Sequence, residues 1–246
     1  MSVFNALVSP AGLAATVAAA GCMQAAVGTF LVSRFRWQEK RVDREVPLPP
    51  VSVLKPLHGD EPLLEEALES FCTQDYPHMQ IVFGVQAEDD AAIPIVRRLM
   101  ERHPDVPMEL VIDPTFHGVN RKIGNLINIM TRVKHDVLVI SDSDIHVAPD
   151  YLRHVVGAMV PDNVGLVTTL YAGLPASNTV PRLLAACQIN HNFLPGVMLS
   201  RYLGRQDCLG ATMALRRSML DAIGGLEALV PHVADDAIHH QTHNIQ

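Results

Sequence analysis

Cysteine and tryptophan are scarce in this chain of 246 residues, which has four cysteines and one tryptophan. No two cysteines form a CxxC pair, and this spacing argues against a zinc knuckle or a thiol redox motif. Scattered cysteines of this kind fit reduced and mostly buried thiols. No GxGxxG follows the first predicted strand and no GxxxxGK[ST] occurs, so neither a common dinucleotide fingerprint nor a P-loop is supported. The cysteines are Cys22, Cys72, Cys187 and Cys208.

Positive charge is also in short supply. Lysine and arginine number 19 against 26 aspartates and glutamates, which gives a formal net charge of −7. No basic stripe with interleaved aromatic residues is present, so nucleic acid is not expected as a partner. The length fits one domain of moderate size with an appendage.

The appendage is an uncharged stretch near the N-terminus. Residues 11–32 contain no charged side chain, and a helix of this length, at about 1.5 Å per residue, crosses a hydrocarbon core of roughly 30 Å. The basic segment "SRFRWQEKRVDR" follows directly, which favours the cytoplasmic side for the rest of the chain. We therefore predict one transmembrane anchor over residues 1–33 and a basic, proline-rich linker over residues 34–50.

Two other interpretations of the apolar stretch stay open. A signal peptide would need a basic residue before a shorter apolar run, and neither is found. A soluble alanine-rich helix is the simplest alternative.

From residue 51 onward, apolar runs of strand length alternate with helical patterns. Such alternation predicts an α/β domain, placed here at residues 51–246, with a mostly parallel sheet and helices on both faces. Sheets of this kind bind ligands beyond the carboxyl ends of their strands. After residues 210–212, either a strand or a helix is expected. The other expected strands are 51–57, 79–85, 108–113, 136–142 and 164–171, and the helices are 62–74, 91–104, 118–133 and 149–160.

Two acidic clusters fall at strand ends: "AEDD" (87–90) follows the second strand and "SDSD" (141–144) ends the fourth. Residues i and i+2 of an extended segment point the same way, so Asp142 and Asp144 can converge on one point. Two close carboxylates repel each other unless a cation lies between them, and Mg²⁺ or Mn²⁺ prefers oxygen ligands. The pair therefore predicts a metal site, with capping of the next turn or helix as the alternative.

Several motifs occur in an order typical of one enzyme family. They are "SVLKPLHGDEPLLEEALESFCTQDYP", "FGVQAEDD", "GVNRKIGNL", "VLVISDSDIHVAPDYL", "VGLVTTL", "CLGATMALRRSMLDAIGG" and "VADDA". With these motifs, residues 50–237 resemble the family-2-like, processive-type glycosyltransferases, and more narrowly the ceramide glucosyltransferases and the bacterial hopanoid-biosynthesis glycosyltransferases. The resemblance implies a GT-A fold, which is Rossmann-like, after the N-terminal transmembrane helix.

The resemblance also implies roles for five aspartates. Asp89 and Asp90 would contact the base and ribose of the nucleotide. Asp142 and Asp144 would hold a divalent metal, Mg²⁺ or Mn²⁺, and the donor diphosphate. Asp236 in "VADDA" would be the catalytic base that deprotonates the acceptor hydroxyl. The chemistry agrees, because a metal stabilises the departing diphosphate and a single base on the opposite face leads to inversion.

Three further positions are candidates for donor binding. Lys55 ends the first strand, where it would meet the donor, unless it is a surface lysine whose ammonium reaches water. Asn120 and Lys122 open a helix, and a helix N-terminus with basic residues is a ready anion site. The alternative for Asn120 is an ordinary helix N-cap.

The C-terminal part departs from the family pattern. The family carries a (Q/R)xxRW motif after the base aspartate and then further membrane-spanning segments. The sole tryptophan here is Trp37, so the motif is absent. We therefore expect a catalytic domain that is incomplete at its C-terminus, as in a truncated or frameshifted product, with a divergent short form as the alternative.

The expected function is that of a membrane-associated inverting glycosyltransferase. It would move a sugar from UDP-N-acetylglucosamine or UDP-glucose to the hydroxyl of a hopanoid-like or ceramide-like lipid. The expected location is a membrane, the inner membrane if the source is bacterial, with the catalytic domain on the cytoplasmic side. Two alternatives stay open: a family-2 enzyme with a polysaccharide or polyprenyl-type product, and a non-catalytic module that binds a sugar nucleotide.

Overall fold

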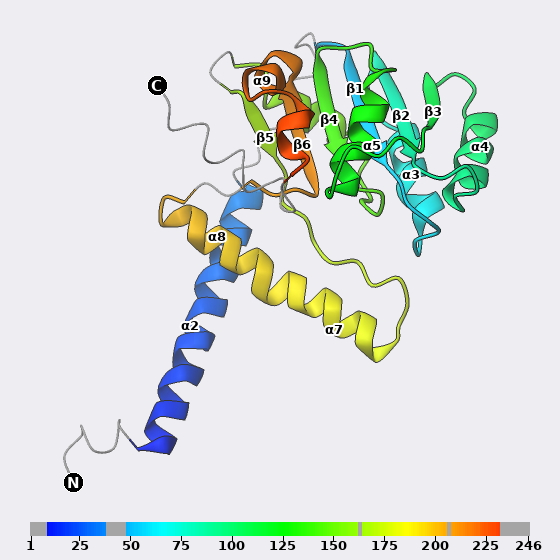
Figure 1. Ribbon diagram of the computed structural model, residues 1–246. Coiled ribbons are helices and arrows are strands. Elements are labelled where there is room, and N and C mark those ends of the chain that lie inside the picture. Colours follow the sequence, from blue (N-terminus) through cyan, green and yellow to red (C-terminus); the bar gives the residue numbers. More distant parts are fainter. Residues whose placement is uncertain (1–8, 38–47, 162–163, 206–207, 232–246) are drawn as a thin grey trace. The chain divides into compact units, whose positions relative to one another are not determined.

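The computed structural model describes residues 9–37, 48–161, 164–205 and 208–231. The chain forms two compact units (Figure 1), of which one comprises residues 1–40 and 170–207 and the other residues 41–169 and 208–246. Residues 170–207, expected within the domain 51–246, thus group with the N-terminal helix.

The larger unit contains a single sheet, whose order in the described part of the chain is β3-β2-β1-β4-β6-β5. Its strands are β1 (Val51–Pro56), β2 (Met79–Val85), β3 (Met108–Ile112), β4 (Val137–Ser141), β5 (Leu166–Thr168) and β6 (Thr212–Arg216). β1 pairs in parallel with β2 and β4, and β2 pairs in parallel with β3. β6 runs antiparallel to β4 and to β5. The prediction of a mostly parallel sheet is therefore confirmed.

Helices cover both faces of this sheet because its central strands are apolar on both sides. Successive side chains of a strand point to opposite faces. Val53 accordingly packs in one core with α3, α4 and α6, whereas its neighbour Leu54 packs in a second core with α5, α9 and η2. The helices are α3 (Leu64–Cys72), α4 (Ala92–Arg102), α5 (Arg121–Met130), α6 (Tyr151–Gly157), α9 (Arg217–Ala222) and the 3₁₀ helix η2 (Leu226–Leu229).

The expected elements between residues 51 and 171 are all present, with ends that differ by a few residues. β5 is the shortest of them, because only Leu166–Thr168 pair with β6. The segment after residues 210–212, left open between strand and helix, forms β6 and then α9.

The regular elements of the smaller unit are all helices in the residues that the structure describes, and residues 170–179 are irregular. It consists of α2 (Pro10–Trp37), α7 (Val180–Gln188), the π-helix η1 (Ile189–Phe193) and α8 (Leu194–Tyr202). α2 packs against α8, and a Cβ at Gly28 would lie 2.3 Å from the Cβ of Pro195. Glycine therefore permits this close approach of the two helices.

α2 has the length and composition of a membrane span. Among the described residues one helical stretch, Pro10–Phe35, is long and apolar enough to cross a membrane, with a mean hydropathy of 1.6 over its best window. Most of its side chains are exposed, as is expected of a helix whose surroundings are lipid rather than protein.

Candidate functional site

The carboxyl ends of β1, β2 and β4 lie at one edge of the sheet, because these strands are parallel. β6 begins at the same edge, where Thr212 is paired with Ser141, the last residue of β4. Asp142 follows directly, and its backbone N–H donates to the carbonyl of Ala211 at 3.0 Å. The first aspartate of the predicted pair is thus held by its backbone between two strand ends.

Lys55 lies at the end of β1 and has an exposed fraction of 0%. Its ammonium donates to the backbone carbonyl of Asp142 and, at 3.3 Å, to Ser141 Oγ. The same Nζ lies 4.1 Å from the centre of the Phe71 ring. Burial lowers the pKa of Lys55 to about 7, although the carboxylate of Asp142 and its neighbours oppose this shift. The surface-lysine alternative is therefore wrong, while contact between Lys55 and a donor stays a prediction.

Lys122 binds the carboxylate of Asp142 directly. Its Nζ lies 2.8 Å from Asp142 Oδ1, and both side chains are partly exposed, 28% and 38% respectively. The ammonium also donates to the carbonyl of Gly210 at 3.4 Å. Burial raises the pKa of Asp142, Lys122 opposes this change, and the charge of Asp144 adds to it. The structure thus brings Lys55, Lys122 and Asp142 together, and their binding of a donor stays a prediction.

Asp144 is exposed and lies close enough to Asp142 for its charge to raise the pKa of that carboxyl. The two aspartates form a donor set made only of oxygen, which suits Mg²⁺ or Mn²⁺. Within the described ranges, no group of three or more His, Cys, Asp or Glu side chains is arranged to hold a metal. A divalent ion at this pair would therefore complete its coordination with water and phosphate oxygens.

Asp90, at the end of "AEDD", is buried and already engaged by the protein. Its Oδ1 accepts hydrogen bonds from the backbone N–H groups of Gly59 at 3.0 Å and Ala92 at 2.9 Å. His58 Nδ1 lies 3.6 Å from the other carboxylate oxygen. The bond to Ala92 satisfies a backbone donor at the start of α4. Asp89 is exposed, so of these two carboxylates it is the one accessible from solvent. The contacts of Asp89 and Asp90 with a nucleotide stay predictions.

The loop after β1 links the two acidic clusters. Gly59 binds Asp90, and two residues later the carboxylate of Glu61 accepts a hydrogen bond from Ser143, which lies between the paired aspartates. Gly59 has a φ of 72°, in the left-handed region that glycine adopts most readily. Glu61 and Ser143 were not predicted as site residues. The sequence feature that could have indicated Glu61 is the acidic pair in "HGDE", which follows the first strand.

The start of α5 is fixed by Asn120, whose Oδ1 accepts from the N–H of Ile123 at 3.1 Å. The N-cap alternative for Asn120 is therefore confirmed, and a second role in anion binding stays a prediction. Because Lys122 lies in the first turn of this capped helix, its ammonium approaches Asp142 from a rigid element rather than from a loop.

Asn125, one turn further along α5, holds the ends of two strands. Its Nδ2 donates to the carbonyls of Gly84 at 2.8 Å and Leu57 at 3.3 Å. A Cβ at Gly84 would lie 2.5 Å from Asn125 Oδ1 and 2.4 Å from Ile129 Cγ1. A glycine at this position of β2 is therefore needed for α5 to pack against the sheet.

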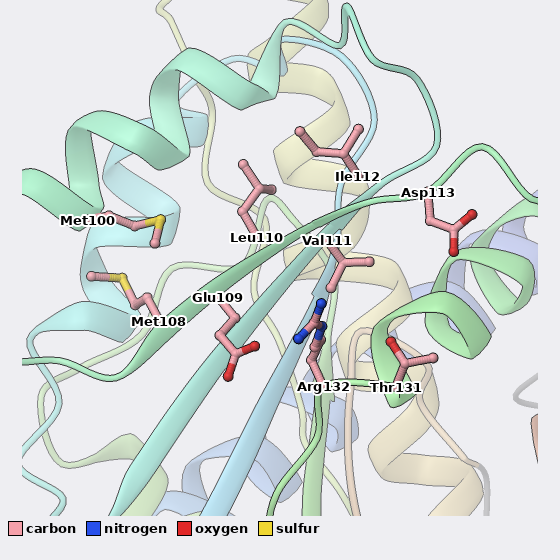
Figure 2. Close-up of a pocket in the computed structure, with 9 residues that line it drawn as sticks. All are labelled: Met100, Met108, Glu109, Leu110, Val111, Ile112, Asp113, Thr131 and Arg132. Carbon is pink, nitrogen blue, oxygen red and sulfur yellow. The ribbon is translucent and has the colours of Figure 1, made fainter.

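A hollow of about 640 Å³ lies elsewhere, along the edge strand β3. Figure 2 shows its lining, in which the charged residues Glu109, Asp113 and Arg132 lie among apolar side chains. None of the predicted site residues that the structure describes lines it. The lining residues are Met100, Met108, Glu109, Leu110, Val111, Ile112, Asp113, Thr131 and Arg132.

The predicted catalytic base, Asp236, lies outside the described residues. Its role as the catalytic base therefore stays a prediction.

The match to a family model covers nearly the whole chain. Residues 13–243 match the model of glycosyl transferase family 21. The chain belongs to this family. The curated relatives of this family-21 chain include ceramide glucosyltransferase 1 of Caenorhabditis elegans, 28% identical over 213 residues, which cover 84% of this chain and 44% of the relative. The ceramide glucosyltransferase of Komagataella phaffii is 31% identical over 124 residues, 47% of this chain and 24% of the relative. The family-21 chain thus spans less than half the length of either relative.

Among solved structures, a similar one is the mannosyltransferase PcManGT from Pyrobaculum calidifontis in complex with GDP-Man and Mn²⁺. It is 25% identical, has a TM-score of 0.55, and the match covers 86% of this chain and 57% of that one. The family-21 chain therefore has the GT-A fold of glycosyltransferases, as the sequence motifs implied.

Proposed function

We propose that this chain is part of a membrane-associated, inverting glycosyltransferase that moves a sugar from a UDP-sugar to a lipid hydroxyl. The observation that carries the proposal is the pair Asp142 and Asp144 at the end of β4, beside Lys55 and Lys122. Two lysines beside two aspartates make a site that is neither strongly anionic nor strongly cationic. Such a site suits a divalent metal together with a diphosphate, whose charges balance each other.

Each residue of the site has a distinct task in this proposal. Asp142 and Asp144 would hold the divalent metal, Mn²⁺ or Mg²⁺, which when bound stabilises the charge that develops on the departing diphosphate. Lys122 and the N-terminus of α5 would bind phosphate oxygens. Asp89 would contact the nucleoside. The solved mannosyltransferase, which contains GDP-Man and Mn²⁺, supports a sugar-nucleotide donor and a divalent metal.

The transfer step needs one proton acceptor. The acceptor hydroxyl would attack the anomeric carbon while the bond to the diphosphate breaks, and the carboxylate of Asp236 would take the hydroxyl proton. Because one base acts opposite the leaving group and no covalent sugar–enzyme intermediate forms, the anomeric configuration would invert.

A lipid acceptor is supported by the apolar surface of the helical unit. α2 has the composition of a membrane span, and the segment that shares its unit exposes large apolar side chains. Val180, Leu184 and Leu203 are 68%, 63% and 75% exposed. Exposure of such large apolar side chains is consistent with a lipid contact. The basic residues after α2 favour a cytoplasmic catalytic domain, and the named relatives are ceramide glucosyltransferases.

Donor binding is tested with Asp144→Ala. We expect the variant to lose Mn²⁺-dependent binding of UDP, measured by calorimetry, because one of the two carboxylate ligands is removed. Asp105→Ala removes an exposed aspartate outside the predicted site and should bind UDP as the parent chain does. Equal Mn²⁺-dependent affinity in parent and Asp144→Ala would refute the metal assignment.

Transfer is tested with radiolabelled UDP-glucose and UDP-N-acetylglucosamine in the presence of lipid extracts. Label in the lipid phase is the expected result. Label only in a water-soluble polymer would show a polysaccharide product instead. UDP-sugar binding without any turnover would identify a non-catalytic binding module.

A further inference from the structure

Lys55 is a charged side chain in a position where an apolar side chain would be buried with a smaller desolvation free energy. It points to the same sheet face as Val51 and Val53, which are both fully buried, because residues i and i+2 of a strand share a face. An ammonium without a carboxylate partner in such a place loses its hydration, which is unfavourable. Positions that break the local pattern in this way are expected at functional sites.

The ammonium of Lys55 has three interaction partners. One hydrogen bond goes to the backbone carbonyl of Asp142 and one to Ser141 Oγ, and the Phe71 ring provides a cation–π contact. Ser141 Oγ in turn lies 3.1 Å from Thr212 Oγ1, and both hydroxyl-bearing residues are fully buried. A lysine from β1 therefore holds the end of β4, which a further hydrogen bond ties to the start of β6.

Lys55 and Lys122 differ in what they bind. Lys122 pairs with the Oδ1 atom of Asp142, so it competes with a metal for that oxygen. The hydrogen bonds of Lys55 go to the backbone of Asp142 and to a hydroxyl, not to a carboxylate oxygen. Its positive charge nevertheless acts on both Asp142 and Asp144. Lys55 thus offsets the repulsion of the pair without occupying a metal ligand.

We propose that Lys55 is a positioning residue for the metal–diphosphate site. By holding the Asp142 carbonyl, it fixes the backbone that directs the Asp142 and Asp144 carboxylates to one side. This inference rests on the proposed function, since it assigns Lys55 a task in the same site. It replaces the predicted direct contact between Lys55 and the sugar-nucleotide donor, because the Lys55 side chain is fully buried.

The test is Lys55→Met, which keeps an unbranched side chain of similar volume, one atom shorter, and removes the charged donor. UDP affinity is measured with Mn²⁺ and with EDTA, and thermal unfolding is followed in parallel. Loss of one charge-assisted hydrogen bond corresponds to about tenfold to a hundredfold in affinity. We expect a loss of this size with Mn²⁺ and little change with EDTA, measured at a temperature at which thermal unfolding shows both proteins to be folded. A purely structural role would lower both affinities together.

The matched control is Lys134→Met. Lys134 is an exposed lysine that pairs with Glu109 at 2.6 Å, and it precedes β4 at the opposite edge of the sheet. The same substitution there should leave both UDP affinities unchanged. Equal Mn²⁺-dependent affinity in Lys55→Met and the parent would overturn the proposal.

A second variant decides the case if Lys55→Met does not fold. Ser141→Ala removes one acceptor of the ammonium and keeps the lysine, and we expect about a threefold to tenfold loss of Mn²⁺-dependent affinity for UDP, as for one ordinary hydrogen bond. Unchanged affinity in Ser141→Ala would then overturn the proposal. If the parent chain itself shows no Mn²⁺-dependent binding of UDP, the proposed function fails and this inference with it. If the parent binds UDP with Mn²⁺ and neither Lys55→Met nor Ser141→Ala changes this affinity, the inference about Lys55 is refuted and the proposed function is not.

Discussion

Replacing Lys122 by methionine should change metal binding and nucleotide binding in opposite directions. In the structure, the Lys122 ammonium lies 2.8 Å from Asp142 Oδ1, an oxygen that a divalent ion would need. Removing the ammonium removes a competitor for this oxygen and a positive charge beside the metal. The same removal takes away a cation that would bind the diphosphate of UDP.

The size of each effect follows from the exposure of the pair. Lys122 and Asp142 are 28% and 38% exposed, so their ion pair contributes about 1 kcal/mol, at the upper end of exposed pairs. This corresponds to about a fivefold gain in affinity for Mn²⁺ alone. A charged hydrogen bond to phosphate contributes about 1.5 kcal/mol or more, so Mn²⁺-dependent affinity for UDP should fall about tenfold or further.

The assay has two parts, both at low ionic strength, because salt screens such charges. Bound Mn²⁺ is measured by electron paramagnetic resonance without nucleotide, and UDP binding is measured by calorimetry at saturating Mn²⁺. Lys134→Met serves as the control for loss of a lysine charge. The reasoning is refuted if Lys122→Met binds Mn²⁺ more weakly than the parent, or if its affinity for UDP is unchanged.

Two further predictions concern stability. Gly84→Ala should lower the free energy of unfolding by about 1–3 kcal/mol, because the new Cβ would lie 2.4 Å from Ile129 Cγ1; an unchanged urea midpoint would contradict this packing. The second prediction concerns pH, because burial lowers the pKa of Lys55 from 10.5 to about 7. Between pH 7 and pH 10.5, the unfolded chain therefore binds more protons at Lys55 than the folded chain does. The contribution of Lys55 to the free energy of unfolding thus rises with pH in this range. Urea unfolding at pH 6.5 and pH 9 should show the parent gaining stability relative to Lys55→Met; a constant difference would argue against a low pKa.

The sheet and its helices could be predicted from sequence because their patterns are local. Apolar runs such as "VLVIS" mark strands buried on both faces, and helical spacing marks the segments between them. The antiparallel direction of β6 could not be predicted, because it depends on pairing with β4, which precedes it by some seventy residues of chain. The grouping of residues 170–207 with α2 likewise depends on tertiary contact.

The site could be predicted only in part, for similar reasons. Asp142 and Asp144 were proposed as a metal-binding pair because the i, i+2 spacing at a strand end is visible in the sequence, and their metal site stays a prediction. The burial of Lys55 was not visible, because a lysine at a strand end can equally extend to water. The hydrogen bond between Ser143 and Glu61 joins loops about eighty residues apart, and no short motif encodes such a contact.

The most direct test of the account is a crystal structure of the chain with UDP and Mn²⁺, with manganese located by its anomalous scattering. We predict one manganese peak within coordination distance of the Asp142 and Asp144 carboxylates, with the diphosphate of UDP bound to it. A manganese ion and UDP bound elsewhere, for example in the hollow along β3 (Figure 2), would contradict the assignment of the site.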